Sequence, residues 1–176
     1  MTDTTTTTPT GGTSSGTPVQ VYRVWIRATA EAIWEAITSP EWSDRYGYGG
    51  TVEYDLRPGG AYRTLASAEM KSFGAPDVIV DGEVLEADPP HRLVQTWRML
   101  MDPDNEPEGF TTLTYEIDPQ HGGVCRLTVT HDLTNAPRMS LITDGSSEGE
   151  GGGGWPWVLS GLKTLLETGG PLENHS

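Results

Sequence analysis

The sequence predicts an α+β fold in which a curved antiparallel sheet of six to seven strands wraps around a long C-terminal helix, with two short helices after the first strand. Segment 155–166 carries apolar side chains at helical spacing, so one helix face needs a large apolar surface to cover it. Most of the preceding chain alternates apolar and polar residues between short turns, which is typical of a meandering antiparallel sheet. With 176 residues, 35% of them hydrophobic, the chain can build one core but hardly two.

The first predicted strand begins at Val19, because its even positions from 22 to 26 form an apolar row. Gln20 falls off this row at the start of the strand. Trp25 lies on the opposite, arginine-bearing face. Single exposed apolar residues are common on protein surfaces, so Trp25 is interpreted either as a partly exposed side chain or as a contact with a second subunit in a homodimer.

Two short helices are predicted after this strand. In segment 28–38, Thr29 is suited to cap the helix N-terminus, and apolar side chains at 33, 34 and 37 share one face. The Ser39-Pro40 pair ends this helix. Pro40 also favours one further helical turn over residues 41–46, since its fixed φ angle suits the first position of a helix.

The remaining strands follow from period-two patterns and turn residues. A hairpin is predicted around the turn at 57–60, and residues 71–76 form a connection to the next strand. The acidic link 102–109 and the turn 120–123 have the length of hairpin joins. The predicted strands cover residues 52–56, 61–65, 78–87, 93–101, 111–117 and 124–133.

The chain is predicted to form a single domain over residues 18–169. Residues 1–17 are rich in Thr, Gly and Ser and predict a disordered tail, and residues 170–176 predict a flexible C-terminal tail. Between the last strand and the long helix, Met139, Leu141 and Ile142 suit a short lid. The glycine-rich segment 143–154 is predicted to let the helix or lid move.

Charge and cysteine content exclude several classes of partner. Lys and Arg total 11 against 25 Asp and Glu, and the net charge of −14 would repel nucleic acid and anionic lipid. No apolar run is long enough to cross a bilayer, so no membrane insertion is expected. The single cysteine, Cys125, forms no internal disulfide, which favours a cytoplasmic location.

Searches for catalytic and cofactor motifs return nothing. The sequence lacks a phosphate-binding loop, a nucleophile elbow, paired cysteines and the zinc motif His-Glu-x-x-His. His91, His121, His131 and His175 show no metal-ligand spacing, and Cys125 is interpreted as a small buried hydrophobic residue. No metal and no cofactor are therefore predicted.

Five segments, taken in order, resemble the SRPBCC or START-like superfamily and, within it, the bacterial branch similar to the activator of heat-shock-protein ATPase. The resemblance covers about residues 19–169 and implies the helix-grip fold of that superfamily. The segments are Ile26–Glu41, Leu56–Arg63, Gly82–Trp97, Leu127–His131 and Gly154–Lys163.

The resemblance also implies a deep pocket between the sheet and the C-terminal helix. Members of the superfamily include binders, lipid carriers, cyclases and chaperone regulators, so function depends on the pocket lining. Strand parity predicts which side chains face the helix. For any single apolar one, core packing is the favoured interpretation, whereas the set as a whole favours a binding site. The predicted ligand-binding residues are Tyr62, Trp97, Met99, Met101, Leu113, Tyr115, Leu127, Val129, His131, Trp155 and Leu159.

The leading functional prediction is a protein that holds a small apolar or amphipathic molecule in this cavity. One alternative is a cyclase- or hydrolase-type enzyme acting on a polyketide-like or aromatic substrate, in which His131 or Tyr62 would take part. His131 has no carboxylate tied to it by spacing, because Asp132 points to the other face, so it is also interpreted as a structural histidine. A chaperone-regulating, protein-interaction role on the outer sheet face is the second alternative.

Overall fold

The structure, a computed structural model, describes residues 18–146 and 153–173. The predicted N-terminal tail at 1–17 and the middle of the glycine-rich segment lie outside the described residues. Of the predicted C-terminal tail, residues 170–173 are described and form bends beyond the last helix.

The predicted curved antiparallel sheet of six to seven strands is confirmed, and it has seven strands. The strand order is β1-β7-β6-β5-β4-β3-β2, so β2 to β7 form a meander and β1 joins it beside β7. The strands are β1 (Val19–Ile26), β2 (Thr51–Tyr54), β3 (Ala61–Leu65), β4 (Val78–Asp88), β5 (Arg92–Met99), β6 (Thr111–Pro119) and β7 (Cys125–Asp132).

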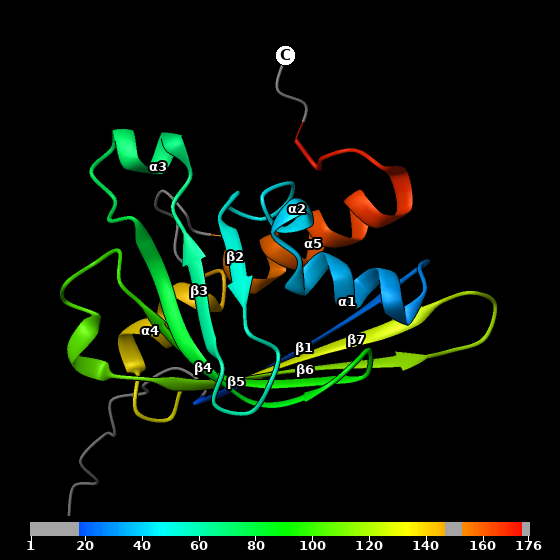
Figure 1. Cartoon of the computed structure of the whole chain (residues 1–176), viewed down its shortest axis with the longest axis horizontal. Helices are drawn as coiled ribbons and strands as arrows, with labels where there is room; N and C mark the ends of the chain where they lie inside the picture. The colour runs from blue at the N-terminus through cyan, green and yellow to red at the C-terminus, as the bar shows by residue number, and fades with distance from the viewer. Residues whose placement is uncertain (1–17, 147–152, 174–176) are drawn as a thin grey trace, which may run out of the picture.

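Three of the helices, α1, α2 and α5, lie on the concave side of this sheet, as Figure 1 shows, whereas α3 lies beyond the ends of β3 and β4. Register shifts in the β3–β4 and β4–β5 pairs mark bulges, which increase twist and help the sheet to curl. The helices are α1 (Ala30–Thr38), α2 (Pro40–Ser43), α3 (Ala68–Ser72), α4 (Pro137–Thr143) and α5 (Gly154–Thr168), with a 3₁₀ turn η1 (Glu106–Glu108).

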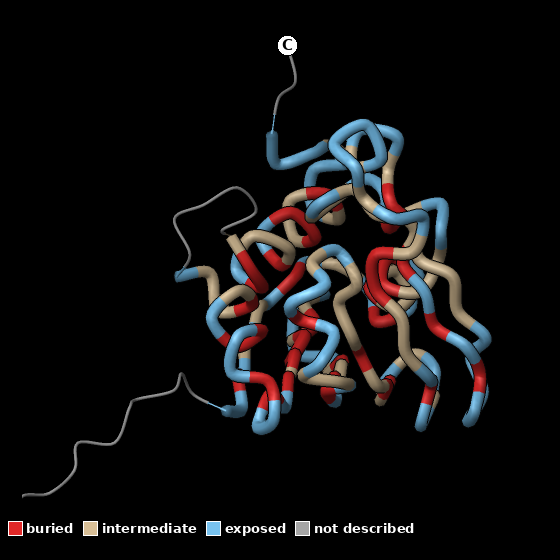
Figure 2. Tube along the Cα trace, turned by 90° about the vertical axis from the view of Figure 1, so that its left-hand side faces the viewer, coloured by how far each residue is buried: buried red, intermediate tan, exposed pale blue. Residues whose placement is uncertain are grey.

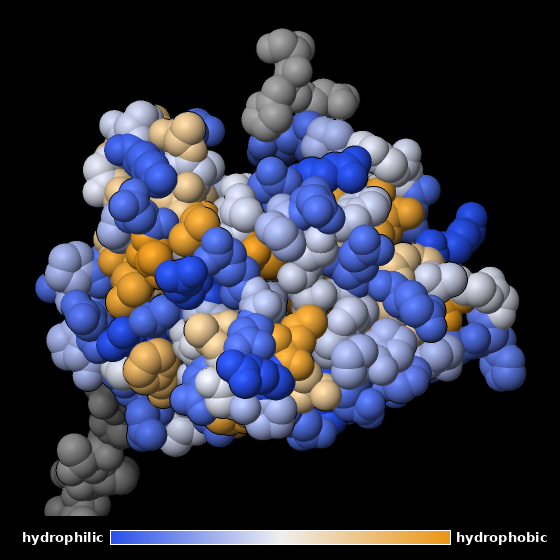
Figure 3. Space-filling model, viewed as in Figure 1, coloured by the Kyte–Doolittle hydropathy of each residue, from blue (hydrophilic) through white to orange (hydrophobic). Residues whose placement is uncertain are grey.

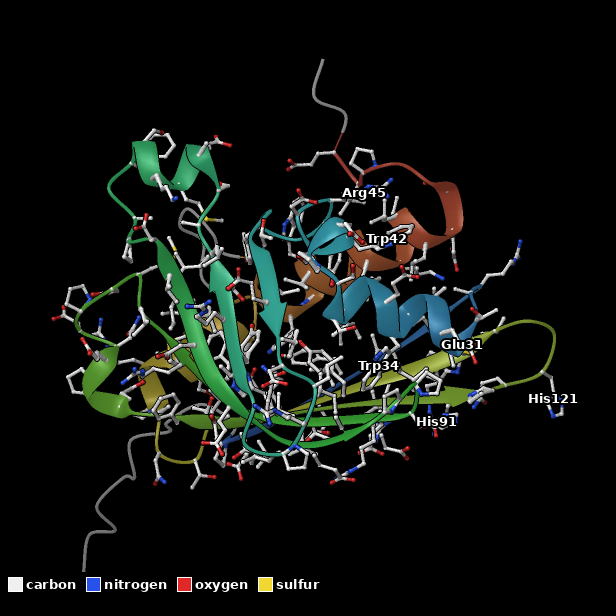
Figure 4. The ribbon with its side chains drawn as sticks, in the orientation of Figure 1. Glu31, Trp34, Trp42, Arg45, His91 and His121 are labelled. Carbon is white, nitrogen blue, oxygen red and sulfur yellow. The ribbon has the colours of Figure 1, made fainter. Side chains whose placement is uncertain are left out.

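The two predicted short helices are confirmed together with their signals. The Thr29 side chain accepts a hydrogen bond from the backbone N–H of Ala32 at 3.1 Å and caps α1. Pro40 occupies the first turn of α2, although this helix ends at Ser43 rather than at residue 46. Beyond it, the Arg45 guanidinium lies 4.7 Å from the centroid of the Trp42 ring, and Figure 4 shows these two side chains beside each other.

The C-terminal helix α5 is anchored to β1 at its far end. Lys163 Nζ donates a hydrogen bond to the Trp25 carbonyl at 2.7 Å, and the Glu167 carboxylate accepts one from the Arg27 N–H at 2.9 Å. The Trp25 side chain itself is 50% exposed, so in the monomer it is a partly exposed surface residue. A second subunit on that face stays a prediction.

Three local expectations are corrected. Gln20 is buried on the inner row of β1, because Ser140 and Thr143 of α4 supply hydrogen-bond partners for its amide. The segment expected to be only a connection contains α3, whose N-cap Ser67 accepts from the Met70 N–H at 3.2 Å. Strand β5 ends at Met99 instead of residue 101.

Buried residues gather on the segments that face the interior, and exposed ones on the outer loops (Figure 2). In one half of the molecule, α1 packs on β6 and α5 packs on β1. Gly82 shows how closely the strands approach: a Cβ atom there would collide with the backbone carbonyl of Thr96 on β5. In the opposite half of the sheet, from β2 to β5, a space remains between the strands and the helices.

Candidate functional site

A cavity of about 430 Å³ lies between the β2–β5 half of the sheet and the start of α5. Its volume falls within the range usual for small-molecule sites. The lining comes from nearly every element around that half: Ile37, Ser43, Tyr46, Gly47, Tyr48, Gly50, Val52, Tyr54, Tyr62, Thr64, Met70, Ile79, Val80, Trp97, Met99, Met101, Asp102, Asn105, Tyr115, Ile142, Thr143, Gly154, Trp155 and Val158.

The walls are mainly aromatic and thioether side chains. The rings of Tyr54 and Tyr62 stack with their centroids 4.6 Å apart, and Tyr115 meets Trp155 edge to face at 6.1 Å. Three lining methionines add flexible side chains that adapt to irregular shapes. Such a surface suits a flat, largely apolar molecule.

The cavity reaches the surface beside the β5–β6 connection. Met101 lines the cavity and is 44% exposed, so one side of its side chain faces solvent. Figure 3 shows apolar residues gathered on the surface below α3 and surrounded by hydrophilic ones. This exposed side is where an apolar molecule could enter the cavity.

The structure brings together six of the eleven predicted ligand-binding residues. Tyr62, Trp97, Met99, Met101, Tyr115 and Trp155 line the cavity. The other five are absent from the lining, since the helices pack directly on the sheet there and leave no space: Leu113, Leu127, Val129, His131 and Leu159.

Sequence reasoning missed the lining residues supplied by connections. Met70 comes from α3, Asn105 from the β5–β6 connection and Ile142 from α4. Tyr54 could have been found, because it falls on the apolar alternate positions of the first hairpin. The capping serine at residue 67 was a signal for α3, whereas nothing local indicated that the β5–β6 connection reaches the cavity.

At the cavity mouth, α4 and the β5–β6 connection are joined by hydrogen bonds. The Glu108 carboxylate accepts from the backbone N–H groups of Arg138 and Met139 at 2.9 and 3.2 Å, and so satisfies the start of α4. Arg138 Nε donates to Asn105 Oδ1 at 3.2 Å and its guanidinium lies 3.5 Å from the Asp102 carboxylate. These contacts hold α4 against the β5–β6 connection.

Four of the lining phenols are hydrogen-bonded within the protein, and the Tyr48 hydroxyl accepts from the Gly154 N–H at 2.9 Å. Tyr46 donates to the Ala36 carbonyl at 2.9 Å and Tyr54 to Gln95 Oε1 at 2.7 Å. The hydroxyls of Tyr62 and Thr64 are 2.8 Å apart. Burial raises the pKa of Tyr46, Tyr54 and Tyr62, so these groups stay neutral.

His131 is held in one tautomer by two hydrogen bonds, and a third fixes the direction of one of them. Trp155 Nε1 donates to His131 Nδ1 at 3.1 Å, so Nδ1 carries no proton. His131 Nε2 therefore carries it and donates to Thr111 Oγ1 at 2.7 Å, which in turn donates to the Trp97 carbonyl at 2.9 Å. Burial lowers the pKa of His131 to about 4, although Asp132 acts in the opposite direction.

This network makes His131 a structural residue behind the cavity wall. Its ring also lies edge to face with Trp97 at 5.0 Å and with Trp155 at 6.0 Å. Both nitrogen atoms are occupied and the side chain is fully buried, so neither faces a bound molecule. His131 positions two tryptophans that line the cavity.

We expect Trp155→Phe to destabilise the protein by about 1–3 kcal/mol, because His131 Nδ1 would be buried without a donor. Urea unfolding at pH 7 measures the change. Trp157→Phe is the matched control, since that indole donates to the Gly47 carbonyl in a partly buried position and should cost less. Equal losses in the two variants would contradict the assigned network.

The other described histidines lie away from the cavity. His91 and His121 are exposed in turns, and Figure 4 shows His121 at the tip of the β6–β7 hairpin. Within residues 18–146 and 153–173, no three His, Cys, Asp or Glu side chains are placed to hold a metal ion. In the same ranges, no helix is both long and apolar enough to span a membrane.

A curved antiparallel sheet with a long C-terminal helix across its concave face defines the helix-grip class of START-like proteins. Residues 27–167 match the family model described as Activator of Hsp90 ATPase homolog 1-like protein. The chain belongs to this family. A search of curated protein sequences finds no match.

Solved structures agree on the fold. The crystal structure of CalU16 from Micromonospora echinospora has a TM-score of 0.58 at 20% identity, covering 86% of this chain and 77% of that one. PFC0360w, an HSP90 activator from Plasmodium falciparum, has a TM-score of 0.53 at 22% identity, covering 89% and 91%. DynU16, from the dynemicin biosynthetic locus, has a TM-score of 0.60 at 20% identity, covering 88% and 49%.

Proposed function

We propose that this protein binds a small apolar or amphipathic molecule in the cavity between the sheet and α5. The observation that carries the proposal is the cavity of about 430 Å³ with its aromatic and methionine walls. If a ligand buried about 300 Å² of apolar surface, the gross gain would be about 7 kcal/mol, against an association cost of at least about 4 kcal/mol. We therefore expect micromolar or weaker binding unless polar contacts add to it.

An enzyme acting in the same cavity has less support. His131, the expected acid or base, is fully buried behind the wall and both ring nitrogens are engaged. The Tyr62 hydroxyl is shared with Thr64, and burial raises the pKa of that phenol, which disfavours its use as a base. The remaining lining is suited to holding a molecule rather than transforming it.

A chaperone-regulating role rests on similarity alone. PFC0360w is described as an HSP90 activator, whereas DynU16 belongs to a biosynthetic locus, so relatives of one fold differ in role. Small-molecule binding is the better-supported proposal because it uses a feature of this chain itself. We also propose that the protein acts in the cytoplasm, which cell fractionation of its native host would test.

The test is a screen of apolar and amphipathic compounds, read by tryptophan fluorescence and native mass spectrometry. Val80 on β4 lines the cavity, so Val80→Trp should fill part of it and weaken binding at least tenfold. Val21→Trp places the same side chain at an exposed position of β1 and serves as the control. The proposal fails if no compound binds, or if Val80→Trp binds as tightly as the parent protein.

A further inference from the structure

One hydroxyl in the cavity has no hydrogen-bond partner among the described residues. Tyr115 on β6 lines the cavity, and its phenol makes none of the bonds that occupy Tyr46, Tyr54 and Tyr62. Burial raises its pKa well above the ordinary value, so the group stays a neutral O–H. Because this O–H borders an apolar cavity and has no acceptor in the protein, an oxygen acceptor bound there would gain a hydrogen bond from it.

A second donor points to the same chemistry. Asn105 lines the cavity and is only 2% exposed. Arg138 Nε can only donate, so the Asn105 oxygen must face it, and this fixes the amide orientation. The remaining Nδ2 group is buried and has no partner among the described residues. It too is a donor available to an oxygen acceptor.

The charges around the cavity exclude an acidic ligand. Of the described residues that line it, Asp102 alone has a charged side chain, and no lining residue is cationic. Arg138 lies outside the lining, where its contacts are with Asp102 and Asn105. A carboxylate in the cavity would lose its hydration and gain no cation in return.

We propose that the ligand is an uncharged aromatic molecule bearing a carbonyl oxygen, and that the Tyr115 hydroxyl donates the hydrogen bond that selects it. This inference rests on the proposed function and names the ligand class of the same site. The stacked and edge-to-face rings on the walls supply contacts for the aromatic part. Asn105 Nδ2 provides a second donor at the mouth of the cavity.

Three matched compounds test the proposal with the full chain: fluorene, 9-fluorenone and 9-fluorenone-2-carboxylate. They share one ring system and differ by a carbonyl and then by a carboxylate. Isothermal titration at pH 7 should give fluorenone about five- to tenfold tighter binding than fluorene, the effect of one added hydrogen bond. The carboxylate should bind at least about tenfold more weakly than fluorenone.

The Tyr115→Phe variant keeps the ring and removes only the hydroxyl. We expect it to bind fluorene as the parent does and to lose the preference for fluorenone. Tyr22→Phe is the matched control, because that hydroxyl donates to Gln20 outside the lining. It should leave the preference unchanged.

Each outcome decides a separate point. Equal binding of fluorene and fluorenone by the parent protein, or a preference that survives in Tyr115→Phe, overturns the role of Tyr115 while ligand binding stands. Carboxylate binding as tight as that of fluorenone overturns the selection for uncharged molecules. If neither neutral compound binds to the parent protein, the ligand class proposed here is wrong, and the broader compound screen decides whether the binding function falls with it.

Discussion

Acidification from neutral pH to pH 4 is expected to remove about 3 kcal/mol of stability through His131 alone. Its pKa is lowered from 6.5 to about 4 by burial, so the unfolded chain binds this proton more readily than the folded protein does. The contribution is fully present above pH 6.5 and is lost as the pH falls through that value toward 4. Protonation would also set a second N–H against the donor of Trp155.

Urea unfolding of the parent protein and His131→Gln between pH 4 and pH 7 isolates this contribution. Carboxylates also titrate below pH 5, but they do so in both proteins, so the difference between the two curves reports His131. His121→Gln is the control, because that side chain is exposed at a hairpin tip. A pH dependence unchanged by His131→Gln would contradict the buried neutral tautomer.

Leu127→Ala is expected to destabilise the protein by about 2–5 kcal/mol and to leave ligand affinity unchanged. Leu127 on β7 is fully buried and pairs with Val24 of β1 and Ile117 of β6. Removing its side chain loses apolar burial and leaves a cavity in the closely packed half of the molecule. The ligand cavity, at the other half of the sheet, has a separate lining.

Thermal unfolding and ligand titration of the same variant test the two halves of this prediction. Leu85→Ala provides the comparison, because Leu85 on β4 is 45% exposed and its truncation should cost under about 0.5 kcal/mol. A tenfold loss of affinity in Leu127→Ala, measured where the variant is folded, would show that Leu127 belongs to the ligand site after all.

Strand parity identified inward-facing side chains well but did not separate the cavity from the core. Trp97 and Leu127 both face inward from neighbouring parts of the sheet, yet only Trp97 lines the cavity. The difference arises because α1 and α5 cover one half of the curved sheet closely. That placement depends on contacts between segments far apart in the chain, which periodicity cannot report.

Residues in connections were hardest to predict. Asn105 lies in an acidic link that has no regular pattern, and its burial depends on Arg138 and Glu108 holding α4 against that link. The role of Gln20 was missed for the same reason, since its partners are in α4, more than a hundred residues away. Polar residues of this kind are buried only where another segment supplies their hydrogen bonds.

The sequence by itself determined the order of the strands, the two short helices after the first strand, the single long amphipathic helix and the family, because these depend on local periodicity, turns and caps. Only the tertiary structure decided which inward-facing residues border empty space, that His131 is neutral and structural, and that Tyr115 is the unpartnered donor. Packing and hydrogen bonding between distant segments control those properties. Residues that are adjacent in the sequence therefore do not predict them.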